Sequence, residues 1–244
     1  MRRAVVLTHA DFEGPGRLAD ILAEEGYELD ERAIHRGDHV PAELEPSALL
    51  VVMGGSMGVA DRDRPEHAFL AQEIALLESR IRDRAPALGI CLGAQLLAHA
   101  AKARVFAMRA RQPEAAHYEV GWADVHFDRA SAVPVLDGLP GVAPMLHWHG
   151  DAFELPPGAR RLAWSAACAQ QAFQIHDRLF GLQFHAEVGL AEIEQFLRGD
   201  ADFVVTANGP GGVERIRRDT ERVFAEFRAI GERLLRNIVR ACAK

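Results

Sequence analysis

A cysteine between two glycines is the first position in this sequence with the setting of a nucleophile. Residues 86–95 read Pro-Ala-Leu-Gly-Ile-Cys-Leu-Gly-Ala-Gln, with an apolar run before Cys91 and helix formers after it. This G-x-C-x-G pattern predicts a strand, a sharp turn and a helix. Unpaired N–H groups at a helix N-terminus favour the thiolate, the form that attacks carbon. Cys91 is therefore the candidate nucleophile, and a small buried apolar residue is the alternative.

A histidine and a glutamate could activate such a thiol. The segment Gly181-Leu-Gln-Phe-His-Ala-Glu187 places His185 and Glu187 two positions apart after an apolar run. In an extended backbone both side chains therefore project on the same side. An imidazole can take the thiol proton and return it to a leaving amine, while the carboxylate orients the ring. A surface ion pair is the alternative.

A glycine-rich loop, Gly54-Gly-Ser-Met-Gly58, follows a buried apolar run over residues 47–53. It is not a phosphate-binding loop, because no Gly-Lys-Ser/Thr follows it. Its free N–H groups can form half of an oxyanion hole, and the N–H of Leu92, just after the candidate nucleophile, can form the other half. A plain tight turn is the alternative.

Two histidines and an aspartate alternate in His147-Trp-His149-Gly-Asp151. Alternate histidines on a strand can share one face, and an aspartate could complete a metal site with them. No further cysteine or histidine stands at the spacing of a metal-binding motif. We therefore expect no metal and no other cofactor, and interpret the segment as a substrate-binding edge.

The composition is that of a soluble globular protein. The chain has 244 residues, 49% of them hydrophobic, and a formal net charge of -7, which argues against nucleic acid or an anionic membrane as the main partner. The N-terminus lacks the apolar core of a signal peptide, and no run is long enough to span a bilayer. The 3 cysteines show no C-x-x-C spacing. A cytoplasmic location with reduced thiols is the expectation.

Strand and helix patterns alternate in the first half of the chain. We expect strands at residues 3–8, 27–34, 47–53 and 87–90, and helices at 16–25, 68–84 and 94–101. Strands joined through helices pair in parallel by right-handed crossovers, which predicts a doubly wound α/β sheet flanked by helices. Ligands of such sheets bind beyond the carboxyl ends of the strands, where both the glycine loop and Cys91 are expected.

The pattern becomes β-rich after residue 107. Short strands are expected at 118–127, 144–148, 161–165, 172–175 and 179–184, followed by a helix over 190–197 and a turn or hinge at 208–212. A long, charged, amphipathic segment covers residues 213–239, and Gly231 is a candidate interruption of it. Its apolar stripe could cover this domain or a partner, and we expect it to cover this domain.

Together, the elbow Gly-Ile-Cys-Leu-Gly-Ala-Gln, the loop Met-Gly-Gly-Ser-Met-Gly and the segment Gln-Phe-His-Ala-Glu resemble the triad glutamine amidotransferases, especially lone domains similar to the glutaminase part of GMP synthase. The resemblance covers about residues 3 to 198 and implies a flavodoxin-like, mostly parallel α/β core that releases ammonia from glutamine through a γ-glutamyl thioester. It divides the chain into an amidotransferase-like domain, 1–198, and a C-terminal helical extension, 199–244. The roles that it implies are Cys91 as nucleophile, His185 as base, Glu187 as its orienter, Gly55 and Leu92 as oxyanion donors, and Gln95, His149, Gly150 and Asp151 as substrate-binding residues.

Two features depart from the family pattern. Ala186 stands where proline is commonest, which should loosen that turn but leaves His185 and Glu187 intact. No ATP-binding synthetase region follows residue 197, so any ammonia-accepting synthetase is expected to be a separate subunit.

Three functions remain open from the sequence. The first is a glutamine amidotransferase or amidohydrolase that uses Cys91. The second is a γ-glutamyl peptide hydrolase with the same chemistry and a different leaving amine. The third is a catalytically idle interaction subunit, against which the intact Cys91, His185 and Glu187 argue.

Overall fold

A nine-stranded sheet, with the strand order β2-β1-β3-β4-β11-β10-β9-β6-β7, forms the centre of the protein. The structure is a computed structural model that describes residues 2–108, 118–131 and 133–244. The parallel strands are β2 (Tyr27–Ala33), β1 (Arg2–Thr8), β3 (Leu49–Val52), β4 (Ala87–Ile90) and β11 (Leu179–Leu182). Numbered among themselves, they have the flavodoxin-like order 2-1-3-4-5.

Antiparallel strands extend this sheet on the β11 side. They are β10 (Ala172–Ile175), β9 (Arg160–Ser165), β6 (Glu119–Phe127) and β7 (Val142–His149). A separate two-stranded sheet pairs β5 (Val105–Ala107) with β8 (Asp151–Phe153). The β-rich second half therefore completes the main sheet, and the predicted α/β fold class is confirmed. The sequence patterns did not predict β5 and β8.

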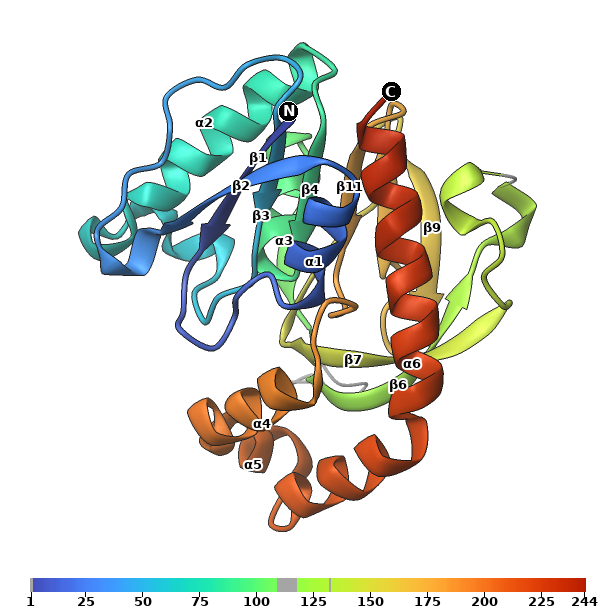
Figure 1. Ribbon diagram of the computed structural model, residues 1–244. Coiled ribbons are helices and arrows are strands. Elements are labelled where there is room, and N and C mark those ends of the chain that lie inside the picture. The colour runs from blue at the N-terminus through green and yellow to red at the C-terminus, as the bar shows by residue number, and fades with distance from the viewer. Residues whose placement is uncertain (1, 109–117, 132) are drawn as a thin grey trace.

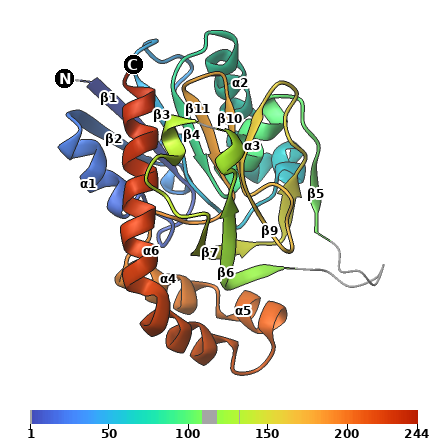
Figure 2. The same cartoon turned by 90° about the vertical axis from the view of Figure 1, so that its right-hand side faces the viewer.

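Helices cover both faces of the sheet, because alternate residues of each parallel strand point to opposite sides. On one side Val6 of β1 packs in a cluster with Leu22 of α1 (Arg17–Glu24). On the other side Val5 packs with Leu77 of α2 (Phe69–Arg82) and Leu96 of α3 (Leu92–Ala100). Figure 2 shows the parallel strands between these two helix layers.

Short 3-10 segments join several of these elements. They are η1 (Ile34–Arg36), η2 (Val59–Asp63), η3 (Pro65–His67), η4 (Arg129–Ser131) and η5 (Pro134–Leu136). The chain then ends in α4 (Leu190–Gly199), α5 (Ala201–Asn208) and α6 (Gly212–Cys242). In Figure 1, α4 and α5 lie at the bottom of the molecule, and α6 runs upward along the same face of the sheet as α1.

Helix α6 is continuous over 31 residues and runs through Gly231 without a break. Its apolar side chains lie in the same core cluster as α1, and Phe227, Leu234 and Leu235 are buried there. A Cβ built on Gly231 would lie 2.7 Å from the carbonyl oxygen of Ala186, so glycine lets the helix approach that loop closely. The amphipathic segment therefore packs on its own domain, as the sequence predicts.

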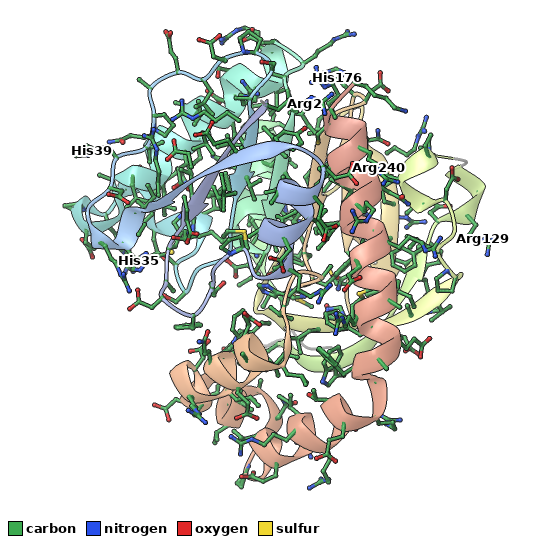
Figure 3. The ribbon with its side chains drawn as sticks, in the orientation of Figure 1. Arg2, His35, His39, Arg129, His176 and Arg240 are labelled. Carbon is green, nitrogen blue, oxygen red and sulfur yellow. The ribbon has the colours of Figure 1, made fainter. Side chains whose placement is uncertain are left out.

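Charged pairs surround the end of α6. Arg240 donates to Glu25, just after α1, over 3.0 Å (Figure 3), and Arg236 donates to the same carboxylate over 3.0 Å. Arg240 is largely exposed, so its pair contributes little to stability.

No helix in the described part of the chain has both the length and the apolar character needed to cross a membrane.

Candidate active site

Cys91 occupies a strained turn between β4 and α3. Its φ of 52° and ψ of −109° lie outside the regions that non-glycine residues normally adopt. Two glycines make this turn possible. A Cβ built on Gly93 would lie 1.9 Å from the carbonyl oxygen of Val52, and one on Gly89 would lie 2.3 Å from the carbonyl oxygen of Gly93. The G-x-C-x-G pattern thus reflects the close packing of the turn, and this packing maintains the strained conformation of Cys91 at the carboxyl end of β4.

His185 and Glu187 form a buried pair after β11. Nδ1 of His185 lies 2.7 Å from Oε1 of Glu187, and both side chains are 1% exposed. The backbone N–H of His185 donates to the carbonyl of Leu146, and that of Arg17 donates to the carbonyl of Glu187. Bonds on both sides therefore hold the segment. Nε2 of His185 has no hydrogen-bond partner among the described residues.

The electrostatics of Cys91 and His185 are coupled. Burial raises the pKa of the Cys91 thiol, and the His185 imidazole and the N–H of Leu92 oppose this effect. Burial also lowers the pKa of His185, but the Glu187 carboxylate and the Cys91 side chain outweigh it, so the pKa lies well above its usual value. The thiol is thus less acidic than its helix N-terminal position alone predicts, because it is desolvated. The raised pKa of His185 favours the imidazolium form, which pairs with the Cys91 thiolate and so offsets part of this loss of acidity.

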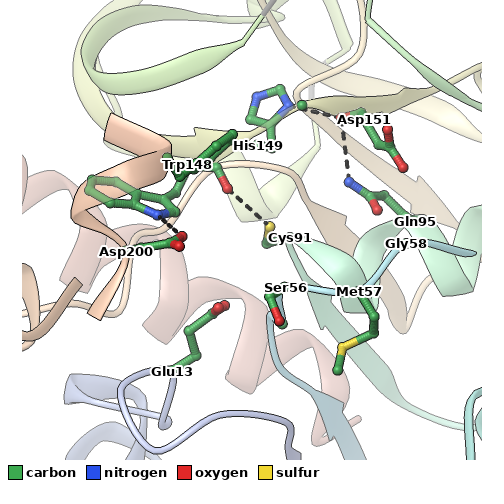
Figure 4. A pocket seen from close by; sticks show the side chains of 13 residues that line it. Glu13, Ser56, Met57, Gly58, Cys91, Gln95, Trp148, His149, Asp151 and Asp200 are labelled. Carbon is green, nitrogen blue, oxygen red and sulfur yellow. Dashed lines mark hydrogen bonds between the residues drawn. The ribbon is translucent and has the colours of Figure 1, made fainter. Parts of the chain in front are cut away.

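A cavity of about 230 Å³ opens next to the thiol (Figure 4). Its lining includes most of the residues that the sequence predicts for the site, namely Gly55, Cys91, Gln95, His149, Gly150 and Asp151. His185, Glu187 and Leu92 are buried beside it and are not part of the lining. The structure therefore brings residues from β4, β7 and the loop after β3 together around one space.

The two predicted oxyanion donors lie on either side of the turn. A Cβ built on Gly55 would be 3.1 Å from Cδ2 of Leu92, so the glycine loop and the start of α3 are in close contact. The N–H of Leu92 stabilises the negative form of the Cys91 side chain. The N–H of Leu92 thus faces the thiol, and the glycine loop packs against the start of α3.

Gln95 and the segment after β7 are joined by hydrogen bonds. Nε2 of Gln95 donates to Oε1 of Gln183 over 3.2 Å and to the backbone carbonyl of Asp151 over 3.4 Å. Nδ1 of His149 donates to the same carbonyl over 2.9 Å. These bonds fix one wall of the cavity.

The carboxylate that the alternate histidines face is that of Glu119, not that of Asp151. Ligand atoms of Glu119, His147 and His149 lie within 4.8 Å of one another, and all three residues are buried. The oxygens of Glu119 accept from Ser165 over 2.6 Å and from Gln171 over 2.7 Å. Burial raises the pKa of Glu119, but His149, His147 and the Ser165 hydroxyl outweigh it and lower the pKa to about 2. Burial lowers the pKa of His147 to about 4. The cluster is thus a buried polar network around one carboxylate, next to the cavity.

Several cavity residues were not identified from the sequence. Figure 4 shows Glu13 and Asp200 on one side of Cys91, and Gln95 and Asp151 on the other. Glu13 is 6% exposed, and burial, partly offset by His185 and His9, raises its pKa to about 7. The indole N–H of Trp148 donates to Asp200 over 2.9 Å. Glu13 follows β1, so its position beyond a strand end was a usable signal. Asp200 and Phe203 come from the C-terminal helices and carry no local motif.

Known proteins share both the sequence and the fold of this chain. The model of the family "Glutamine amidotransferase class-I" matches residues 17–201. A glutamine amidotransferase-like protein of Salmonella typhimurium, YfeJ, is 24% identical over 208 residues, which cover 85% of this chain and 84% of that protein.

Similarity also extends to a longer enzyme and to a solved structure. The glutamine-hydrolyzing GMP synthase of Thermomicrobium roseum is 37% identical over 166 residues, but these cover 63% of this chain and only 28% of the synthase. The crystal structure of a glutamine amidotransferase from Thermotoga maritima superposes with a TM-score of 0.81 at 26% identity, covering 100% of this chain and 98% of the other.

Proposed function

Because this chain belongs to the class I glutamine amidotransferase family, we propose that it hydrolyses the γ-amide of glutamine at Cys91. The balanced reaction converts glutamine and water into glutamate and ammonia. The observation that carries the proposal is the strained Cys91 thiol at the edge of a cavity, coupled to a buried His185–Glu187 pair.

Acylation begins with proton transfer from the Cys91 thiol to Nε2 of His185. The thiolate attacks the γ-carbonyl carbon, and the C–N bond breaks as the imidazolium returns the proton to the departing ammonia. Glu187 accepts the Nδ1 proton in a hydrogen bond, which keeps Nε2 directed away from it and stabilises the imidazolium. The product of this half-reaction is a γ-glutamyl thioester on Cys91.

Deacylation repeats the sequence with water. His185 takes a proton from water, whose oxygen attacks the thioester carbon, and the C–S bond breaks to release glutamate and the thiol. In both halves the N–H groups of Gly55 and Leu92 stabilise the negative oxygen of the tetrahedral intermediate. Gln95, His149, Gly150 and Asp151 line the space for the amino-acid end of the substrate.

The acidic lining of the cavity also supports a second candidate, a γ-glutamyl amide hydrolase with a larger leaving amine. Glu13, Asp151 and Asp200 place three carboxyl groups around the thiol. Such groups suit a substrate that carries ammonium groups, whether the α-ammonium of the glutamyl part or one on the leaving amine. The catalytic steps are the same in both candidates.

Ammonia would be used by an acceptor enzyme. This chain spans 28% of the length of the Thermomicrobium roseum GMP synthase. We propose a separate synthetase subunit as the acceptor, and glutamine hydrolysis that is slow until this subunit docks.

Mass spectrometry of the intact protein tests the function. Incubation with 6-diazo-5-oxo-norleucine, a glutamine-like electrophile, should add one adduct on Cys91, and Cys91→Ala should fold normally without labelling or turnover. Ammonia release from glutamine and amine release from γ-glutamyl dipeptides separate the two candidates. Full turnover by Cys91→Ala would overturn the mechanism. A protein that takes up no adduct and hydrolyses neither substrate would favour an idle interaction subunit.

A further inference from the structure

A buried histidine lies on the far side of the glycine loop from the thiol. Nδ1 of His9 is 2.8 Å from the carbonyl oxygen of Gly54, and Nε2 is 2.9 Å from Oε1 of Glu73. The side chains of His9 and Glu73 are both fully buried. The His9 ring also stacks on Phe69, with 5.7 Å between ring centroids. Neither His9 nor Glu73 belongs to the cavity lining.

The protonation of His9 follows from its partners. A carbonyl oxygen only accepts hydrogen bonds, so Nδ1 carries a proton and donates it to Gly54. Burial lowers the pKa of His9, but the Glu73 carboxylate outweighs it, and the pKa lies above its usual value. Both ring nitrogens of His9 face oxygen atoms, Nδ1 the Gly54 carbonyl and Nε2 the Glu73 side chain, so Glu73 fixes the ring with Nδ1 toward Gly54.

This contact determines the direction of the Gly55 N–H. The sheet order β1-β3-β4 places the loop after β3 between His9, just after β1, and Cys91, just after β4 (Figure 1). The described part of the chain has no cis peptide bond. In a trans peptide the C=O and the following N–H point in opposite directions. Since the Gly54 carbonyl points to His9, the Gly55 N–H points toward the β4 side, where Cys91 lies.

A Gly-Gly peptide has little intrinsic preference for one orientation, because neither residue has a Cβ to restrict its rotation. Figure 4 shows that the loop continues through Ser56 and Met57 past Cys91, at the open cavity. If the Gly54–Gly55 peptide turned over, its N–H would point away from Cys91 and could not donate to a substrate oxygen. The buried imidazole N–H on the carbonyl side both fixes the plane of the peptide and polarises it, which strengthens the opposite N–H as a donor.

We infer that His9, oriented by its contact with Glu73, is the positioning residue that locks the Gly54–Gly55 peptide with its N–H in the oxyanion hole. The inference rests on the proposed function for the identity of the oxyanion. It assigns His9 no contact with substrate. Its action is confined to the stabilisation of negative charge on the substrate oxygen, and the ionisation of Cys91 stays independent of it.

Two matched variants test this lock. His9→Asn/Glu73→Gln retains an amide donor near the position of Nδ1, whereas His9→Leu/Glu73→Gln has none. Both lack the buried Glu73 carboxylate, which would otherwise remain without a partner. With γ-glutamyl p-nitroanilide as substrate, the Leu variant should lose about 10²- to 10³-fold in kcat with KM changed less than about threefold. The Asn variant should recover most of that loss.

Alkylation of Cys91 by iodoacetamide shows whether a variant disturbs the whole active site or only the orientation of the Gly54–Gly55 peptide. Its rate at a fixed pH reports thiolate formation, and it should agree between the two variants within about threefold. Equal kcat values for the two variants would overturn the inference, as would a parallel loss of alkylation and kcat in the Leu variant. If the Leu variant does not fold, His9→Gln/Glu73→Gln replaces it, because the longer amide reaches the position of Nε2 instead of Nδ1.

Crystal structures of the wild type and the two variants show the orientation of the 54–55 peptide directly, so they test the inference separately from the proposed function. A wild type that hydrolyses no γ-glutamyl donor refutes the function. In that case a turned 54–55 peptide in the Leu variant alone would still support the lock, and an unchanged peptide in all three proteins would refute it.

Discussion

The carbonyl oxygen of Ala186 occupies the space next to Gly231, 2.7 Å from where a Cβ on that glycine would stand. Helix α6 therefore touches the peptide segment between His185 and Glu187. Arg17 holds the other side of this segment through its bond to the Glu187 carbonyl. The relative positions of the two proposed catalytic side chains thus depend on a helix that starts after residue 211.

Gly231→Ala should impair activity more than stability. The added methyl must displace the Ala186 carbonyl or the helix, at a cost of about 1–3 kcal/mol. A gain of about 1 kcal/mol from replacing a helical glycine offsets part of that cost. We expect kcat to fall by about tenfold or more with a melting temperature close to that of the wild type. Gly141→Ala is the matched control, because its Cβ would meet only Arg129 at 3.7 Å. Equal kcat for both variants would contradict the coupling.

His185→Ala and Glu187→Gln should differ in severity. Loss of the base should reduce kcat by several powers of ten, while Glu187→Gln removes the carboxylate that orients and charges the ring and should cost less, on the order of 10²-fold. Steady-state rates of ammonia release measure both. A larger loss in Glu187→Gln than in His185→Ala would show that His185 is not the base.

Glu13→Gln should raise stability at alkaline pH. Burial raises the pKa of Glu13 from 4.5 to about 7, so the folded protein binds this proton more tightly than the unfolded chain does. The stability that this proton contributes is present below pH 4.5 and is lost as the pH rises through about 7. At about 1.4 kcal/mol per pH unit, the loss amounts to about 3 kcal/mol.

Urea unfolding of Glu13→Gln and the wild type at pH 5 and pH 8 measures this difference. We expect the variant to gain up to about 3 kcal/mol relative to the wild type between the two pH values. A free-energy difference that does not change with pH would show that Glu13 is ionised in both states. KM for glutamine at pH 8 should increase in the variant if the carboxylate contacts the substrate's ammonium.

Truncation after Asn208 should prevent folding. The buried residues that α6 contributes include Phe227, Leu234, Leu235, Ile238 and Val239. At about 2 kcal/mol for each buried side chain, their loss is comparable to the total stability of a typical domain. Circular dichroism should show no cooperative thermal transition. Removal of residues 243–244 alone is the control and should leave the transition intact. A folded truncated protein would show that α6 is an optional addition.

The sequence predicts well what local chemistry specifies. The tight glycine packing at Cys91 and the two-residue spacing of His185 and Glu187 are local, so the pattern predicts the turn and the shared side of the strand. The parallel strands could be predicted equally well, because each is a short apolar run between helices. The fold class is confirmed, whereas the roles of the site residues stay predictions.

Contacts between distant segments could not be predicted in this way. Glu13, His9 and Asp200 carry no motif, and their importance depends on which strand ends and helices are neighbours. The lowered acidity of Cys91 has the same origin, because desolvation depends on the whole surrounding fold and not on the helix that follows the residue. The pairing of Glu119 with His149 likewise depends on the antiparallel register of β6 and β7.

Every strand of the sheet precedes α6 in the chain. During synthesis, the ribosome therefore releases the whole sheet before the helix that covers much of one face. Until α6 emerges, the apolar side chains of α1, β6 and β7 that it covers are open to other nascent chains and to chaperones. The segment that carries His185 also lacks one of its supports in this interval. Since that support arrives only with Gly231, we expect the proposed glutamine hydrolysis to begin only after most of α6 has been translated.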